Sequence, residues 1–199
     1  MARLRAYRWL GLAGVVVVLC ADASILLSQP TSASQRRTQF HSMVATLRAD
    51  LTACDNRAAA AVWAWQKRVQ GSGSLSHAEA PAKAAAVACN PSTGNGVFNL
   101  TLYAVPTALP KLRLNYAVSC LGVWAQEDVQ PAMLAIQDLL RQPADQTEAT
   151  AYRRAAGFAA SNLASANLVL QRAARKLGIT DFAPLQLTSL TTTGRVQPN

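Results

Sequence analysis

Residues 51–65 have the sequence LTACDNRAAAAVWAW, in which the apolar side chains recur at steps of three and four. This spacing places Leu51, Cys54, Ala58 and Trp65 on one face of an α-helix. Four consecutive alanines strengthen the prediction, because alanine has the highest helix propensity of all residues. The stretch therefore predicts a helix with a cysteine on its buried face.

The apolar spacing continues in both directions and predicts one amphipathic helix over residues 36–70. GSGS at 71–74 follows it as a flexible turn. Ser76 and Glu79 then have the spacing of a capping box, in which each side chain binds the backbone of the other residue. We therefore expect a second, shorter helix that ends at CNP, residues 89–91.

A third helical pattern begins near Pro110 and ends at RQP, residues 141–143. Pro131 should kink or split this helix, because proline lacks a backbone donor and clashes with the preceding turn. Asp128 could then cap the second half. Before this helix, residues 92–109 are expected to form an ordered connector with an apolar face.

The fourth helix has a clear beginning and a clear end. Asp145 and Glu148 resemble a second capping box, and Gly178 is a C-terminal stop signal. Residues 187–199 are polar and rich in threonine, so we expect a flexible tail there.

Together these patterns predict an all-α fold. Three long helices of similar length and one short helix favour an elongated antiparallel bundle over residues 36–186. A hydrophobic content of 51% excludes a disordered chain.

The N-terminal residues 1–29 have the pattern of a signal anchor. Three arginines precede an apolar stretch from Trp9 to Leu27, about the length of a transmembrane helix. This order predicts a cytoplasmic N-terminus and an extracytoplasmic bulk, joined by a linker at 30–35. A cleaved signal peptide is the alternative, since residues 21–23 (ADA) have the form of a cleavage site. The protein would then be secreted or periplasmic.

The net charge of +9 is scattered along the chain, with no run of five basic residues. A nucleic-acid partner is therefore not favoured. Another membrane or extracytoplasmic protein, an anionic lipid or an acidic wall polymer is compatible with this charge.

Cys54 and Cys89 lie at similar distances from the turn that joins the first two helices. In a hairpin they would be nearly level, and export to an oxidising compartment would allow a disulfide between them. Two alternatives stay open: a Cys54–Cys120 pair, or an unpaired Cys54 in the core.

The sequence does not favour catalysis or metal binding. His41 and His77 are too far along their helices from Cys54 to activate a thiolate. Glu127 and Asp128 are adjacent and point about 100° apart, so they do not form an acid–base pair. We expect no enzyme activity, no cofactor and no metal site.

One face of the fourth helix, opposite its apolar stripe, combines basic, small and apolar side chains. This face is a candidate docking surface, although an ordinary solvated face has the same composition. Its residues are Arg154, Phe158, Ser161, Ser165, Leu168, Arg172, Arg175 and Lys176.

These observations predict a membrane-tethered or exported accessory or scaffold protein that acts by protein–protein binding. The alternative is an extracytoplasmic small-molecule-binding or sensory domain, with a gap between helices near Pro131. An apolar pocket near Trp124 would favour this alternative.

Overall fold

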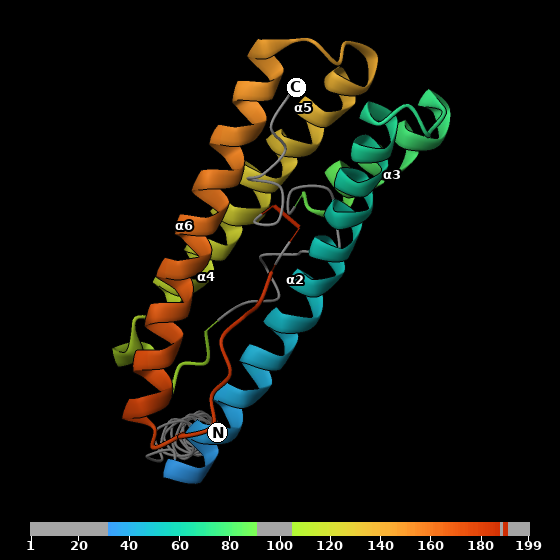
Figure 1. Cartoon of the computed structure of the whole chain (residues 1–199). Coiled ribbons are helices and arrows are strands. Elements are labelled where there is room, and N and C mark those ends of the chain that lie inside the picture. The colour runs from blue at the N-terminus through green and yellow to red at the C-terminus, as the bar shows by residue number, and fades with distance from the viewer. Residues whose placement is uncertain (1–31, 91–104, 188, 191–199) are drawn as a thin grey trace, which may run out of the picture. The chain divides into compact units, whose positions relative to one another are not determined.

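The computed structural model describes residues 32–90, 105–187 and 189–190, shown in colour in Figure 1. Every regular element among these residues is a helix, so the predicted all-α class is confirmed for them. The predicted signal anchor at 1–29 and most of the predicted connector at 92–109 lie outside the described residues. No described helix combines the length and the apolar character needed to cross a bilayer. The chain divides into two compact units, residues 1–35 and 36–199, and the packing below is that of the second.

The first long helix, α2 (Ala33–Val69), begins earlier than the sequence pattern predicts. The Ser32 hydroxyl accepts a hydrogen bond from the Gln35 backbone at 3.1 Å, and the Gln35 side chain accepts one from the Ser32 backbone at 2.8 Å. This reciprocal pair is a capping box. Residues 33–35 of the predicted 30–35 linker are therefore helical.

The short helix α3 (Leu75–Ala88) begins at Ser74, whose hydroxyl accepts a hydrogen bond from the His77 backbone. The predicted capping box of Ser76 and Glu79 is therefore wrong. The helix starts two residues sooner, which places Ser76 inside its first turn. Similar side chains can compete for the cap within one turn, so a cap is easily misplaced by sequence alone.

The third helical pattern forms three consecutive elements, α4 (Leu114–Val123), η3 (Trp124–Val129) and α5 (Gln130–Arg141). η3 is a π-helical turn, in which each backbone bond spans one residue more than in an α-helix. This wider turn ends just before Pro131, whose ring would clash in a regular α-helix. The predicted cap at Asp128 is wrong, since no side chain caps α5 and Asp128 is buried within the π-turn.

The fourth predicted helix, α6 (Gln146–Lys176), has the predicted ends. The Asp145 carboxylate accepts hydrogen bonds from the backbones of Thr147 and Glu148, at 2.8 and 3.3 Å. Gly178 follows the helix at a φ of +69°, in the left-handed region that glycine adopts readily.

The helices of the second unit share one apolar core. α3 packs on α5, while α6 packs on α4, η3 and α5. The Arg141 guanidinium also donates a hydrogen bond to the Glu79 carboxylate across α3 and α5, at 2.8 Å. The largest fully buried side chains are Phe40, Leu47, Leu51, Leu109, Leu114, Leu121, Met133, Ile136, Leu139, Leu140 and Leu170.

Two described residues of the flexible tail that the sequence predicts at 187–199, Leu187 and Leu190, are packed in the core. Residues 179–187 and 189–190, which we call the strap, run without helical structure between α2 and α6 (Figure 1). Leu187 and Leu190 are buried, with 6% and 4% of their surface exposed. Their burial removes them from the expected tail, whose residues 188 and 191–199 lie outside the described part of the chain.

Candidate functional site

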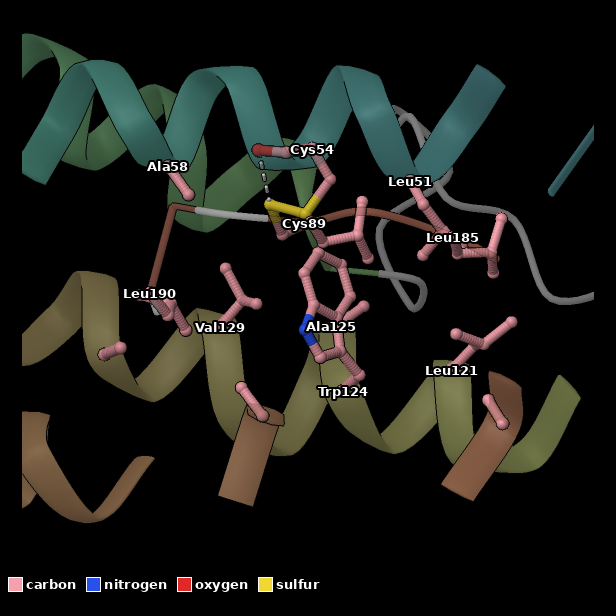
Figure 2. Packing of buried hydrophobic residues seen from close by; sticks show 14 of the residues in the cluster. Leu51, Cys54, Ala58, Cys89, Leu121, Trp124, Ala125, Val129, Leu185 and Leu190 are labelled. Atoms are coloured by element: carbon pink, nitrogen blue, oxygen red, sulfur yellow. Dashed lines mark hydrogen bonds between the residues drawn. A yellow bond between two sulfur atoms is a disulfide. The ribbon is translucent and has the colours of Figure 1, made fainter. Parts of the chain in front are cut away.

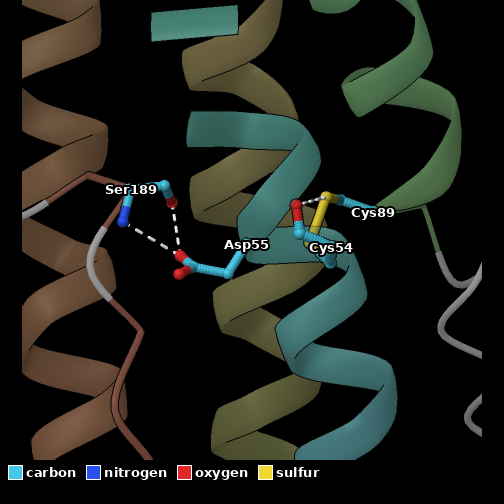
Figure 3. The surroundings of a disulfide bond; sticks show 4 residues. All are labelled: Cys54, Asp55, Cys89 and Ser189. Atoms are coloured by element: carbon cyan, nitrogen blue, oxygen red, sulfur yellow. Dashed lines mark hydrogen bonds between the residues drawn. A yellow bond between two sulfur atoms is a disulfide. The ribbon is translucent and has the colours of Figure 1, made fainter. Parts of the chain in front are cut away.

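The predicted disulfide between Cys54 and Cys89 is confirmed, with their Cα atoms 5.1 Å apart. It joins the middle of α2 to the end of α3 (Figure 3). Cys120 is a free, buried thiol, so the alternative Cys54–Cys120 pair and an unpaired Cys54 are both excluded. Since its sulfur is bonded to Cys89, Cys54 has a structural role.

The indole ring of Trp124 points from the π-turn toward this disulfide (Figure 2). Only 2% of the Trp124 surface is exposed. The cavity beside it, which Asp55 and Ser189 also line, has a volume of about 10 Å³. A cavity of this size holds about one water molecule, so it does not provide the ligand pocket near Trp124 that the binding alternative called for.

The candidate docking face of α6, which we call the α6 strip, is largely exposed. Phe158 and Leu168 have 51% and 45% of their surface in solvent, which is high for large apolar side chains. Arg154, Ser161, Arg172, Arg175 and Lys176 are exposed as well, whereas Ser165 is half-buried. The Arg154 guanidinium lies 5.5 Å from the centre of the Phe158 ring, within the range of a cation–π contact. The strip is thus accessible, and its binding role stays a prediction.

A groove of about 520 Å³ lies between α6 and the consecutive elements α4, η3 and α5, which we call the third helical segment. It opens beside the π-turn and Pro131, where the sequence suggested a gap between helices. Two strip residues, Arg154 and Phe158, line it, whereas the other strip residues do not. The full lining consists of Val123, Glu127, Asp128, Pro131, Ala151, Arg154, Ala155, Phe158 and Asn162.

The pattern of α6 alone could not predict this groove, because part of its wall belongs to α4, η3 and α5. Glu127, Asp128 and Asn162 are its polar residues apart from Arg154. The π-turn is the element that brings Asp128 into contact with α6. π-turns often occur at functional sites, and the proline inside the helical pattern was the available sequence signal.

Asp128 is the buried acid of the groove, with 2% of its surface exposed. Its carboxylate accepts a hydrogen bond from the Asn162 side-chain amide at 2.8 Å. Burial raises the pKa of Asp128 above its ordinary value, the Asn162 hydrogen bond opposes this shift, and the nearby Glu127 carboxylate adds to it. Asp128 can therefore accept a hydrogen bond from a ligand or, once protonated, donate one.

The raised pKa of Asp128 predicts a specific pH dependence of stability. The folded chain holds this proton more tightly than the unfolded chain, so the free energy of unfolding falls as pH rises from about 4 through the folded pKa. We expect Asp128→Asn to remove this fall, so that the variant gains stability relative to the wild type as pH increases. Urea unfolding at a series of pH values measures it.

The matched control for this experiment is Asp138→Asn, because the Asp138 side chain lies on α5 and is 58% exposed. The fall in stability that Asp128 causes as pH rises should persist in this variant, because Asp128 is intact. Parallel profiles for Asp128→Asn and the wild type would contradict the assignment of the shift to Asp128.

The part of the chain that the structure describes contains no group of three or more His, Cys, Asp or Glu residues that could hold a metal ion. His77 contacts the Ser74 hydroxyl through Nδ1 at 2.7 Å, and His41 lies beside the Phe40 ring. Neither histidine is bonded to the disulfide or placed in the groove.

Comparisons of this chain with protein-family models, with curated proteins and with solved structures find no significant match. The groove and the α6 strip are therefore interpreted through their own geometry and chemistry. Both features converge on Arg154 and Phe158, the residues that belong to the strip and to the groove at once.

Proposed function

We propose that the protein is an accessory or scaffold subunit that binds another membrane or extracytoplasmic protein and has no catalytic activity of its own. In this proposal the segment 1–29 tethers it to the membrane, or is cleaved to release it. Residues 36–186 act as an elongated antiparallel bundle that presents the α6 strip. The pairing of Cys54 with Cys89 is consistent with delivery to an oxidising compartment.

The observation that carries the proposal is the exposed pair of Arg154 and Phe158 on the wall of a groove of about 520 Å³. Arginine and aromatic side chains are enriched among the residues that dominate protein–protein binding energy. Phe158 is 51% exposed and would lose that contact with water in a complex. The groove beside it offers space for an apolar side chain of the partner.

The charge of the strip indicates the chemistry of the partner. Arg154 lies near one end, and Arg172, Arg175 and Lys176 lie near the other. An acidic protein surface that pairs with both ends would be attracted and oriented by these charges. Anionic lipid or an acidic wall polymer is compatible with the charges but would not need the groove.

Co-purification of the full-length protein from membranes tests this function. We expect Phe158→Ala and the charge reversal Arg154→Glu each to lower recovery of the partner at least tenfold, since centrally placed residues of these types typically contribute about 2 kcal/mol or more. Arg153→Glu is the matched control. Arg153 is exposed on the same helix, outside the groove, and its guanidinium bonds to Thr150. Unchanged recovery with Phe158→Ala and Arg154→Glu would refute the proposal.

A small-molecule-binding or sensory role is the second candidate, and the same groove supports it. Its volume of about 520 Å³ lies within the range of about 300–1,000 Å³ that is common for ligand sites. The buried Asp128 carboxyl would supply the polar contact that orients a ligand. The two roles differ in their dependence on Asp128, because Asp128→Asn should alter a ligand's affinity and leave an exposed protein contact at Phe158 intact.

A further inference from the structure

The backbone of the strap is held by side chains of the two helices beside it. The Asn167 side chain of α6 donates a hydrogen bond to the Leu185 carbonyl at 2.9 Å and accepts one from the Leu185 N–H at 2.8 Å. On the other side, the Arg48 guanidinium of α2 donates to the Ala183 carbonyl at 2.7 Å. These contacts would be the same for any side chains on the strap, because they involve only its backbone.

The strap also has side-chain anchors. Leu185 and Leu187 are buried, whereas Gln186 between them is exposed, which is the alternation of an extended chain. Leu190 is buried a few residues farther on. The space between α2 and α6, which we call the channel, therefore accommodates an extended segment with apolar residues at alternate positions.

A buried acid adds a third kind of contact. Asp55 lies next to Cys54 on α2 and is 7% exposed. Its carboxylate accepts hydrogen bonds from the Ser189 backbone at 3.0 Å and from the Ser189 hydroxyl at 2.5 Å (Figure 3). A hydrogen bond to a charged group contributes about 1.5–3 kcal/mol, so this contact favours a hydroxyl residue at that position.

Residues 180–187 of the strap are held by side-chain contacts and not by backbone bonds to a helix. Within the described residues, no backbone–backbone hydrogen bond joins 180–187 to a helix; the last such bond runs from Ile179 to Ala174. A cavity of about 290 Å³ lies beside the strap, between Arg48, Thr52 and residues 183–187, so the strap does not fill its channel. Gly178, at a φ of +69°, begins the non-helical segment that leads into the strap.

From these contacts we propose that the channel between α2 and α6 is a binding site for an extended peptide, and that its partner in trans is the strap of a second copy of this chain. The channel recognises the pattern Leu185-x-Leu187-x-Ser189-Leu190, which every copy carries. Exchange of an identical element between two copies produces a symmetric dimer without any new contact surface. The site is independent of the α6 strip, because Asn167 and Phe158 are nine residues apart and lie on opposite faces of the helix.

The intramolecular strap has a high effective concentration, so the monomer should dominate in dilute solution and the exchanged dimer should increase with protein concentration.

Two full-length variants test the strap and the channel separately. Leu185→Asp/Leu187→Asp damages the strap and keeps the channel. Asp55→Ala/Asn167→Ala damages the channel and keeps the strap.

Light scattering after size-exclusion chromatography tests the proposal. Each variant should be monomeric alone, and an equimolar mixture should contain a 1:1 heterodimer, in which the intact channel of one variant holds the intact strap of the other. Absence of the heterodimer in a mixture of two variants that are both helical by circular dichroism would overturn the proposal.

A second measurement applies if either variant fails to fold. A fluorescent peptide with the sequence of residues 181–190 is titrated onto full-length Leu187→Ala/Ser189→Ala, and its anisotropy is recorded. The strap of this variant lacks the hydroxyl bond to Asp55 and part of its apolar anchor, so it competes less with the peptide for the channel. We expect saturable binding, weakened about tenfold or more by Ser189→Ala in the peptide, since its hydroxyl bond to Asp55 is then lost. No saturable binding, or equal binding of a scrambled peptide, would overturn the proposal.

Discussion

Reduction of the Cys54–Cys89 disulfide should lower the free energy of unfolding by about 3–4 kcal/mol, because the bond closes a loop with a sequence separation of 35 residues. Such a cross-link restricts the unfolded chain and so raises its free energy relative to the folded state. The bond also fixes the end of α3 against α2 at a buried position. Urea unfolding with and without a reductant measures the difference.

The Cys54→Ala/Cys89→Ala variant should match the reduced wild type and should not respond to reductant. Cys120→Ala is the control, since Cys120 is a free thiol and its removal leaves the disulfide in place. This variant should lose as much stability on reduction as the wild type does. A loss below about 1 kcal/mol in the wild type would contradict the structural role assigned to the disulfide.

Trp124→Ala should lower the free energy of unfolding by about 3–5 kcal/mol, a loss similar to that expected for reduction of the disulfide. The ring is almost fully buried in the π-turn and points toward the disulfide, so its removal leaves a cavity at the contact of the third helical segment with α2. Chemical denaturation of the purified chain gives the change in free energy. Because the ring and the disulfide are neighbours, the two losses should not be additive.

The matched control for Trp124 is Trp63→Ala. Trp63 is 58% exposed on α2, and its ring has the Lys67 ammonium 4.2 Å from its centre. An exposed cation–π contact contributes about 0.5–1 kcal/mol, so this substitution should cost little. Similar losses for the two tryptophans would contradict the burial pattern described here.

The sequence was informative where structure depends on local spacing. The apolar steps around Cys54 predicted α2, and Asp145 and Gly178 predicted both ends of α6. Cys89 could be paired with Cys54 because both lie at similar distances from the turn that joins two regular helices. In each case, a few neighbouring residues carry the signal.

Features that depend on distant contacts could not be predicted. The bond between Asp55 and Ser189 spans 134 residues, so a polar C-terminal stretch resembled a free tail. The π-turn at Trp124–Val129 shifts the helix by a single residue, which apolar periodicity does not resolve. The groove beside Phe158 exists only because a second helix lies against α6.

We propose that the protein binds a partner through the groove beside Phe158. Site-specific photo-crosslinking in intact membranes, with a photoreactive phenylalanine at position 158, tests it most directly. Position 134 is the control, because Leu134 is 48% exposed on α5 and does not line the groove. We predict one dominant cross-linked membrane or extracytoplasmic protein from position 158 and none from position 134. The same products from both positions, or none from position 158, would contradict the claim.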